Sequence, residues 1–408
     1  MRSKRWKTLA ATLALAFSAG SAWSQSAPVK IKIGVLNDQS GIGVALAGPG
    51  SVVAAQLAIA DYEKAHPGSK IELISADHQN KPDVGSSIAR QWYERDGVSA
   101  IFDVQTSSVA LAVSELTRQQ NKAFIASGAG SADLTGVKCS PNTVQWTYDT
   151  WALANATGSA IVKTGGKSWF FITADYSFGH ALEKDTTSVV LKNGGTVKGH
   201  VLHPFGTADY ASFILQAQAS KSDIVGLATS SGDLINLIKQ SAEFGVSNGG
   251  QKLAALLMFI SDVHALGLNS TQGLLLASAF YWDLTPETRD WSKRFAEKYR
   301  AQMPTMVQAG VYASVLHYLK AVEALPEADR ENGAKVIQKM KDIGTDDVLF
   351  GKGTIRADGR KLHDMYLFQV KTPQESKAPW DYYKKITTIP AAEAFRPIEQ
   401  GGCPLVGQ

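Results

Sequence analysis

The feature that most constrains the fold is an alternation of short apolar runs with amphipathic stretches along most of the chain. The first apolar run, 31–36, is followed by a glycine-rich loop over 40–50 and then by a helical pattern. This alternation predicts strands that pair in parallel and are connected by helices. The first series has predicted strands at 31–36, 71–75, 100–104 and 123–126, and predicted helices at 51–63, 84–93 and 109–119.

A second series of the same kind follows Trp146. Each series can form its own sheet, and about 380 residues with 44% hydrophobic content exceed what a single core usually serves. We therefore expect an α/β protein with two lobes. The second series has predicted strands at 168–173, 196–202, 224–228 and 254–259, and predicted helices at 151–163, 178–191, 210–220 and 232–244.

The last part of the chain departs from this rhythm. Residues 353–356 and 364–370 are strand-like, and they flank the turn Ala357-Asp358-Gly359. Turn residues of this kind favour a reversal of the chain. The pattern predicts a hairpin that is added to the second lobe.

The amino terminus has the pattern of a secretory signal peptide. Four basic residues within the first seven positions precede an apolar run over 8–17, and Ala22 and Ser24 suit a signal peptidase. The apolar run has about ten residues, whereas a membrane span needs roughly twenty. We therefore expect a leader over 1–24, a mature chain that begins near Gln25, and no direct insertion into a membrane. Both cysteines lie far downstream, so no acyl anchor is expected.

Removal of the leader changes the charge balance. Four of the 41 basic residues lie in the leader, which leaves 37 against 37 acidic residues. A chain without a basic excess has no electrostatic footprint for nucleic acid or for anionic lipid. Nucleic acid is therefore not an expected partner.

The two cysteines, Cys139 and Cys403, are expected to pair. An exported chain meets an oxidising compartment, where two cysteines favour one disulfide. This bond would close a long loop and fix the C-terminal tail. Two free thiols are the alternative, because the spacing of the two Cα atoms does not follow from sequence.

Loops that follow the strands are the candidate binding sites. In open α/β sheets, small molecules bind beyond the carboxyl ends of the strands, where helix N-termini present unpaired N–H groups. The candidate loops here are 40–50, 105–108, 127–131, 175–178 and 280–282. Within them, Thr106, Ser107 and Ser108 stand directly before a helix, where hydroxyls and backbone amides can hold a carboxylate. Ordinary N-capping is the other interpretation of these three residues.

Patterns of enzymes are absent from the sequence. The spacing of Gly41, Gly43 and Gly48 does not fit a dinucleotide fingerprint, and no phosphate-binding Gly-Lys-Ser/Thr motif or Gly-x-Ser-x-Gly elbow occurs. His200-x-x-His203 and His180-x-x-Glu183 lack a third ligand at a recognisable spacing. We expect a protein that is not an enzyme and that holds no metal and no cofactor.

Several segments together resemble leucine/isoleucine/valine-type periplasmic binding proteins. In the first lobe these are Ser40-Gly41, Gly48-Pro49-Gly50, Ala55-Gln56-Leu57-Ala58, Ser75-Ala76-Asp77, Thr106-Ser107-Ser108, Ser127-Gly128-Ala129-Gly130-Ser131 and Asp133-Leu134-Thr135. In the second lobe, Ala174-Asp175-Tyr176-Ser177-Phe178-Gly179 looks like the family's aspartate, aromatic and glycine segment. The resemblance covers nearly the whole mature chain through the order and spacing of these segments.

The resemblance implies the type I periplasmic binding protein fold, in which two Rossmann-like lobes with parallel-type sheets are joined by a three-segment hinge. The chain should cross between lobes near 146–149, 281–285 and 351–355. The N-terminal lobe would comprise 25–148 plus 282–352, and the C-terminal lobe 149–281 plus 353–408.

The resemblance also assigns the binding residues. It places the carboxylate of a solute at Ser107 and the backbone of 128–130, and it places apolar contacts at Leu46, Phe178 and 280–282. Amino-acid binders of the family have a threonine where Gly130 stands here, and Asp262 is the nearest acidic candidate for an ammonium group. The predicted ligand-binding residues are Leu46, Thr106, Ser107, Ser108, Gly128, Ala129, Gly130, Tyr148, Tyr176, Phe178, Asp262 and Tyr281.

These residues leave two ligand classes open. Gly130 in place of the hydroxyl weakens the case for an α-amino acid, and the aromatic residues around the cleft suit a flat hydrophobic acid. The resemblance implies a periplasmic substrate-binding component of an ABC importer that binds a small hydrophobic carboxylate, either branched-chain amino acid-like or aromatic. Its partners would be the solute and a membrane permease, and it would act as a monomer. The alternative is a ligand-sensing receptor of the same fold, which the absence of a span after Cys403 disfavours.

Overall fold

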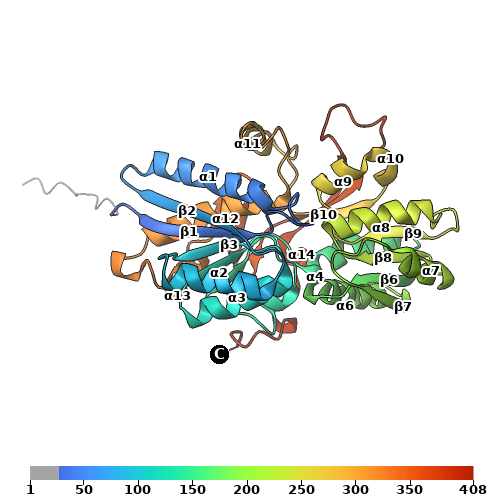
Figure 1. Cartoon of the computed structure of the whole chain (residues 1–408), viewed down its shortest axis with the longest axis horizontal. Helices are drawn as coiled ribbons and strands as arrows, with labels where there is room; N and C mark the ends of the chain where they lie inside the picture. Colours follow the sequence, from blue (N-terminus) through green and yellow to red (C-terminus); the bar gives the residue numbers. More distant parts are fainter. Residues whose placement is uncertain (1–26, 408) are drawn as a thin grey trace, which may run out of the picture.

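The structure, a computed structural model, describes residues 27–407. The predicted leader, 1–24, lies outside the described residues. Figure 1 shows two α/β lobes side by side along the long axis of the molecule, each built around its own sheet. The predicted fold class, a two-lobed α/β protein with parallel sheets, is confirmed.

The first sheet has five parallel strands in the order β2-β1-β3-β4-β5. Most of its strand residues are buried, and β3, β4 and β5 are buried throughout, because helices cover both faces. Its elements are β1 (Lys30–Asn37), α1 (Gly48–Ala65), β2 (Lys70–Asp77), α2 (Pro82–Glu94), β3 (Ala100–Asp103), α3 (Ser107–Gln119), β4 (Ala123–Ala126) and β5 (Thr143–Gln145).

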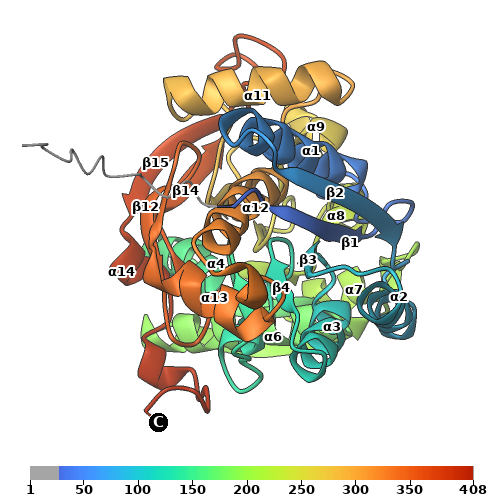
Figure 2. The ribbon, with the colours of Figure 1, turned by 90° about the vertical axis from the view of Figure 1, so that its left-hand side faces the viewer.

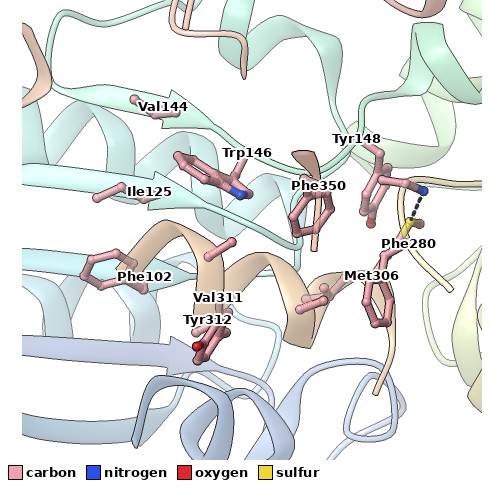
Figure 3. Close-up of a cluster of buried hydrophobic side chains, with 14 of the residues drawn as sticks. Phe102, Ile125, Val144, Trp146, Tyr148, Phe280, Met306, Val311, Tyr312 and Phe350 are labelled. Carbon is pink, nitrogen blue, oxygen red and sulfur yellow. Dashed lines mark hydrogen bonds between the residues drawn. The ribbon is translucent and has the colours of Figure 1, made fainter. Parts of the chain in front are cut away.

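Helices from later in the chain complete this lobe. They are α11 (Pro286–Lys298), α12 (Met306–Glu323) and α13 (Gly333–Asp342). Helix α12 is buried along most of its length and packs against α1. Figure 3 shows Phe102, Ile125 and Val144 of three strands in one cluster with Val311 and Tyr312 of α12. The core of the first lobe therefore joins segments that are far apart in the sequence.

The second sheet has four parallel strands in the order β7-β6-β8-β9. The predicted strand 254–259 is shifted, because the chain leaves the sheet after Ala255 and residues 256–259 lead into helix α9. The elements are α4 (Thr150–Leu153), a π-helical turn (Ala154–Gly158), α5 (Ser159–Lys163), β6 (Ser168–Ala174), α6 (Ser177–Lys192), β7 (Thr196–His203), α7 (Ala211–Ala219), β8 (Ile224–Ala228), α8 (Ser231–Glu243), β9 (Lys252–Ala255), α9 (Ile260–Leu266) and α10 (Leu268–Thr271).

Both sheets are wound in the same sense. In each of them the first strand lies between the second and the third, so the strand order reverses beside β1 in the first lobe and beside β6 in the second. Such a reversal leaves a crevice at the carboxyl ends of the two central strands, where α/β proteins bind ligands. The topology thus gives each lobe one crevice, between β1 and β3 and between β6 and β8.

The predicted hairpin of the tail is wrong, because its two expected strands, 353–356 and 364–370, do not pair with each other. Strand β12 (Gly351–Ile355) pairs with β11 (Thr345–Asp347) and with the short β13 (Lys361–Leu362). Strand β14 (Met365–Val370) instead lies between β10 (Leu275–Ser278) and β15 (Tyr383–Ile389). The turn at 357–359 therefore joins β12 to a strand of only two residues, β13. The chain then enters another sheet as β14.

The segments that connect the lobes follow from these pairings. The chain leaves the first sheet after β5, returns between β10 and α11, and passes from β13 to β14 near His363. The third predicted crossing, at 351–355, falls inside β12 and its small sheet. The division into lobes at 148/149, 281/282 and 352/353 stays a prediction.

A disulfide joins Cys139 to Cys403, with 5.6 Å between the two Cα atoms. Near it, the Arg396 guanidinium donates a hydrogen bond to the carbonyl oxygen of Ala132 at 3.1 Å. The tail that follows β15 is therefore held against the segment between β4 and β5. Within 27–407 the structure contains no helix with the length and apolarity that crossing a bilayer requires.

We predict that mass spectrometry of non-reduced peptides finds Cys139 linked to Cys403. The double variant Cys139→Ser/Cys403→Ser should lose about 2–4 kcal/mol of unfolding free energy, because a cross-link over a sequence separation of 264 residues constrains the unfolded chain. Denaturant titration of both proteins measures the difference. Two free thiols in the native protein would contradict the bond.

Candidate functional site

The crevices of the two lobes face each other and form one pocket. It encloses about 370 Å³ of empty space, its open mouth included. The lining comprises Ile42, Gly43, Leu46, Asn80, Gln105 and Thr106 of the first lobe, Tyr148 of a connecting segment, and Tyr176, Phe178, Phe205, Ser230, Ser231 and Leu257 of the second lobe.

The glycine-rich loop after β1 forms one wall of the pocket. The Asp38 carboxylate accepts hydrogen bonds from the backbone N–H groups of Gly41 at 2.7 Å and Gly43 at 2.8 Å. A Cβ atom at Gly41 would lie 2.8 Å from the same carboxylate, so this close approach requires glycine. The turn holds Ile42 and Gly43 at the pocket.

The segment after β3 forms the adjoining wall. Asp103 and Val104 have φ angles of 80° and 51°, which are rare for residues with side chains and mark a tight turn. Burial raises the pKa of Asp103 to about 6, and its Oδ2 accepts a hydrogen bond from Asn37 at 2.9 Å. The turn places Gln105 and Thr106 at the pocket, where Gln105 Oε1 accepts the N–H of Asp38 at 3.1 Å.

The second lobe contributes the starts of two helices. Tyr176 and Phe178 belong to the start of α6, and Ser230 and Ser231 to the start of α8. The ring of Phe205 meets Tyr176 edge-on at 5.2 Å, and Phe205 is 39% exposed at the pocket mouth. This wall is therefore aromatic near α6 and hydroxyl-bearing near α8.

Tyr148 is fixed from both ends. Its hydroxyl donates a 2.6 Å hydrogen bond to the carbonyl oxygen of Gly128, and its own carbonyl accepts one from the buried Arg360 at 2.9 Å. The Arg360 guanidinium also lies 3.7 Å from the Asp149 carboxylate. Figure 3 shows Tyr148 at the edge of the hydrophobic cluster, two residues beyond Trp146. The connecting segment thus presents a ring of defined orientation.

Gly130 lies directly beneath two rings of the pocket. A Cβ atom there would lie 2.8 Å from the Phe178 ring and 2.9 Å from the Tyr148 ring, closer than real Cβ contacts. Any side chain at position 130 would therefore have to displace the rings. Glycine at this position lets aromatic residues of the second lobe and the connecting segment close over the first lobe.

The pocket is polar but uncharged. None of the described residues that line it is an aspartate, glutamate, lysine or arginine. Both oxygens of Asp38 and Oδ2 of Asp103 accept hydrogen bonds from the protein itself, whereas Oδ1 of Asp103, a residue that does not line the pocket, is buried without a partner among the described residues. The lining therefore offers an ammonium group no carboxylate partner.

Five of the predicted residues line the pocket: Leu46, Thr106, Tyr148, Tyr176 and Phe178. Ser107, Gly128, Ala129 and Gly130 do not line it but lie close to its lining through their contacts. The Ser107 hydroxyl accepts the N–H of Ser131 at 3.1 Å, and the Gly128 carbonyl accepts the Tyr148 hydroxyl. Ser108, Asp262 and Tyr281 do not line the pocket.

Asp262 and Tyr281 have structural contacts instead. Asp262 lies in the first turn of α9, where its Oδ2 accepts the N–H of Phe259 at 2.9 Å. Full burial raises the pKa of Asp262 to about 7. Tyr281 donates to the carbonyl oxygen of Trp380 at 3.2 Å and packs against Tyr383 in the core of the second lobe.

Eight lining residues were not among the predicted site residues. Gln105 and the residues of the 40–50 loop lie in predicted candidate loops, whereas no predicted candidate loop contains Ser230 or Ser231. Ser230 and Ser231 follow the apolar run 224–228 and precede a helix, which is the same pattern as that of 106–108. The eight are Ile42, Gly43, Asn80, Gln105, Phe205, Ser230, Ser231 and Leu257.

Two histidines of the sequence motifs, His200 and His180, contact acids, whereas His203 Nδ1 lies 2.9 Å from the carbonyl oxygen of Pro204. His200 Nδ1 lies 2.5 Å from Glu183 Oε1, and His180 Nε2 lies 2.9 Å from Asp175 Oδ1. Over 27–407, no group of three histidine, cysteine, aspartate or glutamate residues is arranged to hold a metal ion.

The sequence and fold match known solute receptors. The family model described as "Periplasmic binding protein" matches residues 30–377. A periplasmic binding protein from Burkholderia mallei is 47% identical, with a TM-score of 0.89, and the match covers 92% of this chain and 99% of that one. A branched-chain amino acid ABC transporter periplasmic ligand-binding protein from Burkholderia xenovorans LB400 is 37% identical, with a TM-score of 0.80 and the same coverage.

A more distant structure shares the fold. It is a solute-binding protein of an ABC transporter from R. palustris in complex with benzoate. It is 19% identical, has a TM-score of 0.77, and the match covers 88% of this chain and 96% of that one.

We predict that Asp262→Asn stabilises the protein more at pH 8 than at pH 5. Between the unfolded pKa of 3.8 and the folded value of about 7, the folded carboxyl keeps a proton that the unfolded one has lost, so unfolding free energy falls as pH rises. Asparagine does not titrate and can still accept the Phe259 N–H. The gain in unfolding free energy from Asp262→Asn should be about 2 kcal/mol larger at pH 8 than at pH 5.

Denaturant titrations at both pH values measure this growth. Asp290→Asn, which changes an exposed acid on α11, is the control. An Asp262→Asn effect that is equal at pH 5 and pH 8 would refute the raised pKa.

Proposed function

Because the chain belongs to the periplasmic binding protein family, we propose that it binds a small hydrophobic carboxylate between its lobes, and an aromatic acid in preference to an α-amino acid. It binds the solute without chemical change and presents it to the membrane permease of an ABC importer. The solute is held in the pocket where the crevices of both sheets meet.

The observation that carries this proposal is the lining of the pocket. Aromatic rings from the second lobe and the connecting segment surround a space that has no charged side chain. Ring contacts with an aromatic ligand contribute about 0.5–1.5 kcal/mol each beyond burial. An α-amino acid would have to bury its ammonium group without a carboxylate, which costs several kcal/mol.

The known structures support both ligand classes that the sequence left open. The 37% identical protein is described as a branched-chain amino acid receptor, and the 19% identical one contains benzoate. Gly130 supports the aromatic class, because the rings of Tyr148 and Phe178 occupy the space that a side chain at position 130 would need. The pocket geometry therefore favours the aromatic acid.

Binding would favour a closed arrangement of the lobes. The lobes already touch at the pocket, where the N–H of Gly232 points to the carbonyl oxygen of Ile42 at 3.4 Å. A solute that contacts both walls adds further links and shifts the population toward closure. The permease would then recognise the closed shape. Export through the leader at 1–24 would bring the protein to the periplasm, where it would act as a monomer.

We predict that the purified protein binds benzoate with a Kd in the micromolar range or tighter, about −8 kcal/mol, and binds leucine at least tenfold more weakly. Isothermal titration calorimetry with benzoate, leucine, isoleucine and valine measures the order. Tight binding of leucine with no heat from benzoate would contradict the proposed ligand class.

We predict that Phe178→Leu weakens benzoate binding about two- to tenfold, because it removes one ring contact while keeping an apolar side chain. Phe244→Leu is the matched control, since Phe244 follows the far end of α8 and does not line the pocket. Equal benzoate affinities of the two variants would place the ligand away from α6.

A further inference from the structure

Three long helices begin at the pocket without a capping side chain. The N-cap residues of α3, α6 and α8 are Thr106, Tyr176 and Ser230, and all three line the pocket. None of their side chains accepts a hydrogen bond from the first turn of its helix. The Thr106 hydroxyl donates to Asn80 instead. Unpaired N–H groups and the positive ends of three helix dipoles therefore converge on one space.

These helix starts lie on opposite sides of the pocket. Helix α3 belongs to the first lobe, and α6 and α8 belong to the second. At the start of α8 the N–H of Gly232 points to the carbonyl oxygen of Ile42 at 3.4 Å, and a single carboxylate at α3 leaves the neighbouring first-turn N–H groups without a ligand acceptor. The second-lobe end of the pocket is thus also built for electron-rich oxygen.

Ser231 provides an independent sign of a ligand at that end. It is 6% exposed and lines the pocket, and its hydroxyl has no hydrogen-bond partner among the described residues. Its φ angle of 55° is unusual for a residue with a side chain. A buried hydroxyl without a partner is costly unless a ligand supplies one.

The acid in the first turn of α8 is not available to a cation. Asp233 lies in the first turn of α8, but its carboxylate accepts the N–H of Gly206 and the hydroxyl of Tyr210, both at 3.0 Å. It does not line the pocket. The polar groups of the second-lobe end are therefore donors and hydroxyls, with no carboxylate among them.

We propose that Ser231 and the start of α8 form a second anion subsite, so that the preferred ligand is an aromatic dicarboxylate with its two acidic groups at opposite ends of the ring. This inference rests on the proposed function and narrows it. One carboxylate meets the first lobe at α3, and the other meets the second lobe at α8. Such a ligand links the two lobes through both of its ends.

Calorimetry with three ligands of the same shape tests the subsite. Benzene-1,4-dicarboxylate, 4-methylbenzoate and 4-(aminomethyl)benzoate differ only in the group opposite the common carboxylate. We expect the dicarboxylate to bind at least tenfold more tightly than 4-methylbenzoate, and the cationic ligand to bind more weakly than both. A dicarboxylate that binds no better than 4-methylbenzoate would overturn the subsite and leave the proposed function intact. Absence of binding by all three, and by benzoate, would overturn the proposed function as well.

Variants of Ser231 tie the preference to this residue. Ser231→Gly suits the left-handed backbone and should reduce the ratio of dicarboxylate to 4-methylbenzoate affinity at least fivefold. Ser247→Gly, an exposed serine beyond the end of α8, is the matched control and should leave the ratio unchanged. Ser231→Asp should invert the preference, so that 4-(aminomethyl)benzoate binds better than the dicarboxylate. An affinity ratio that Ser231→Gly and Ser231→Asp leave unchanged would refute the assignment.

Discussion

The proposed binding mode depends on one electrostatic constraint, the convergence of three uncapped helix starts on a pocket without charged side chains. First-turn N–H groups need acceptors, and neither N-cap side chains nor acidic lining residues supply them here. The anionic solute that we propose would supply acceptors to both lobes at once. The charged residues missing from the lining leave an ammonium group no carboxylate partner there, and this is why we propose an anionic ligand.

The rest of the fold keeps these helix starts in position. In both sheets the first strand lies between the second and the third, and the crevices at the carboxyl ends of these strands open onto one pocket. Between the lobes, Arg360 is fully buried, and its contacts with the Tyr148 carbonyl and the Asp149 carboxylate offset part of the cost of burying its charge. The Cys139–Cys403 disulfide holds the tail to the segment between β4 and β5. The buried cation thus braces a connecting segment, and the covalent bond fixes the tail.

Much of this frame could be predicted from the alternation of apolar runs and helical stretches, because parallel strands buried on both faces produce that pattern directly. The hairpin of the tail could not, since 361–362 is too short to be recognised as a strand and 365–370 finds its partners in β10 and β15. Phe178 followed from resemblance to the family, Thr106 from its place before a helix, and Tyr148 from the aromatic residues expected around the cleft. The sequence did not indicate that Ser231 and Phe205 line the pocket or that Asp262 bonds to the Phe259 N–H away from it, because burial and the direction of a side chain depend on the packing of distant segments.

Ligand binding should therefore be a mechanical event that draws two lobes together around one solute. Small-angle X-ray scattering with and without saturating benzoate tests this claim most directly. The account predicts a smaller radius of gyration in the presence of the ligand, since contacts to both lobes favour the closed arrangement. An unchanged scattering curve at a benzoate concentration that calorimetry shows to be saturating would contradict it.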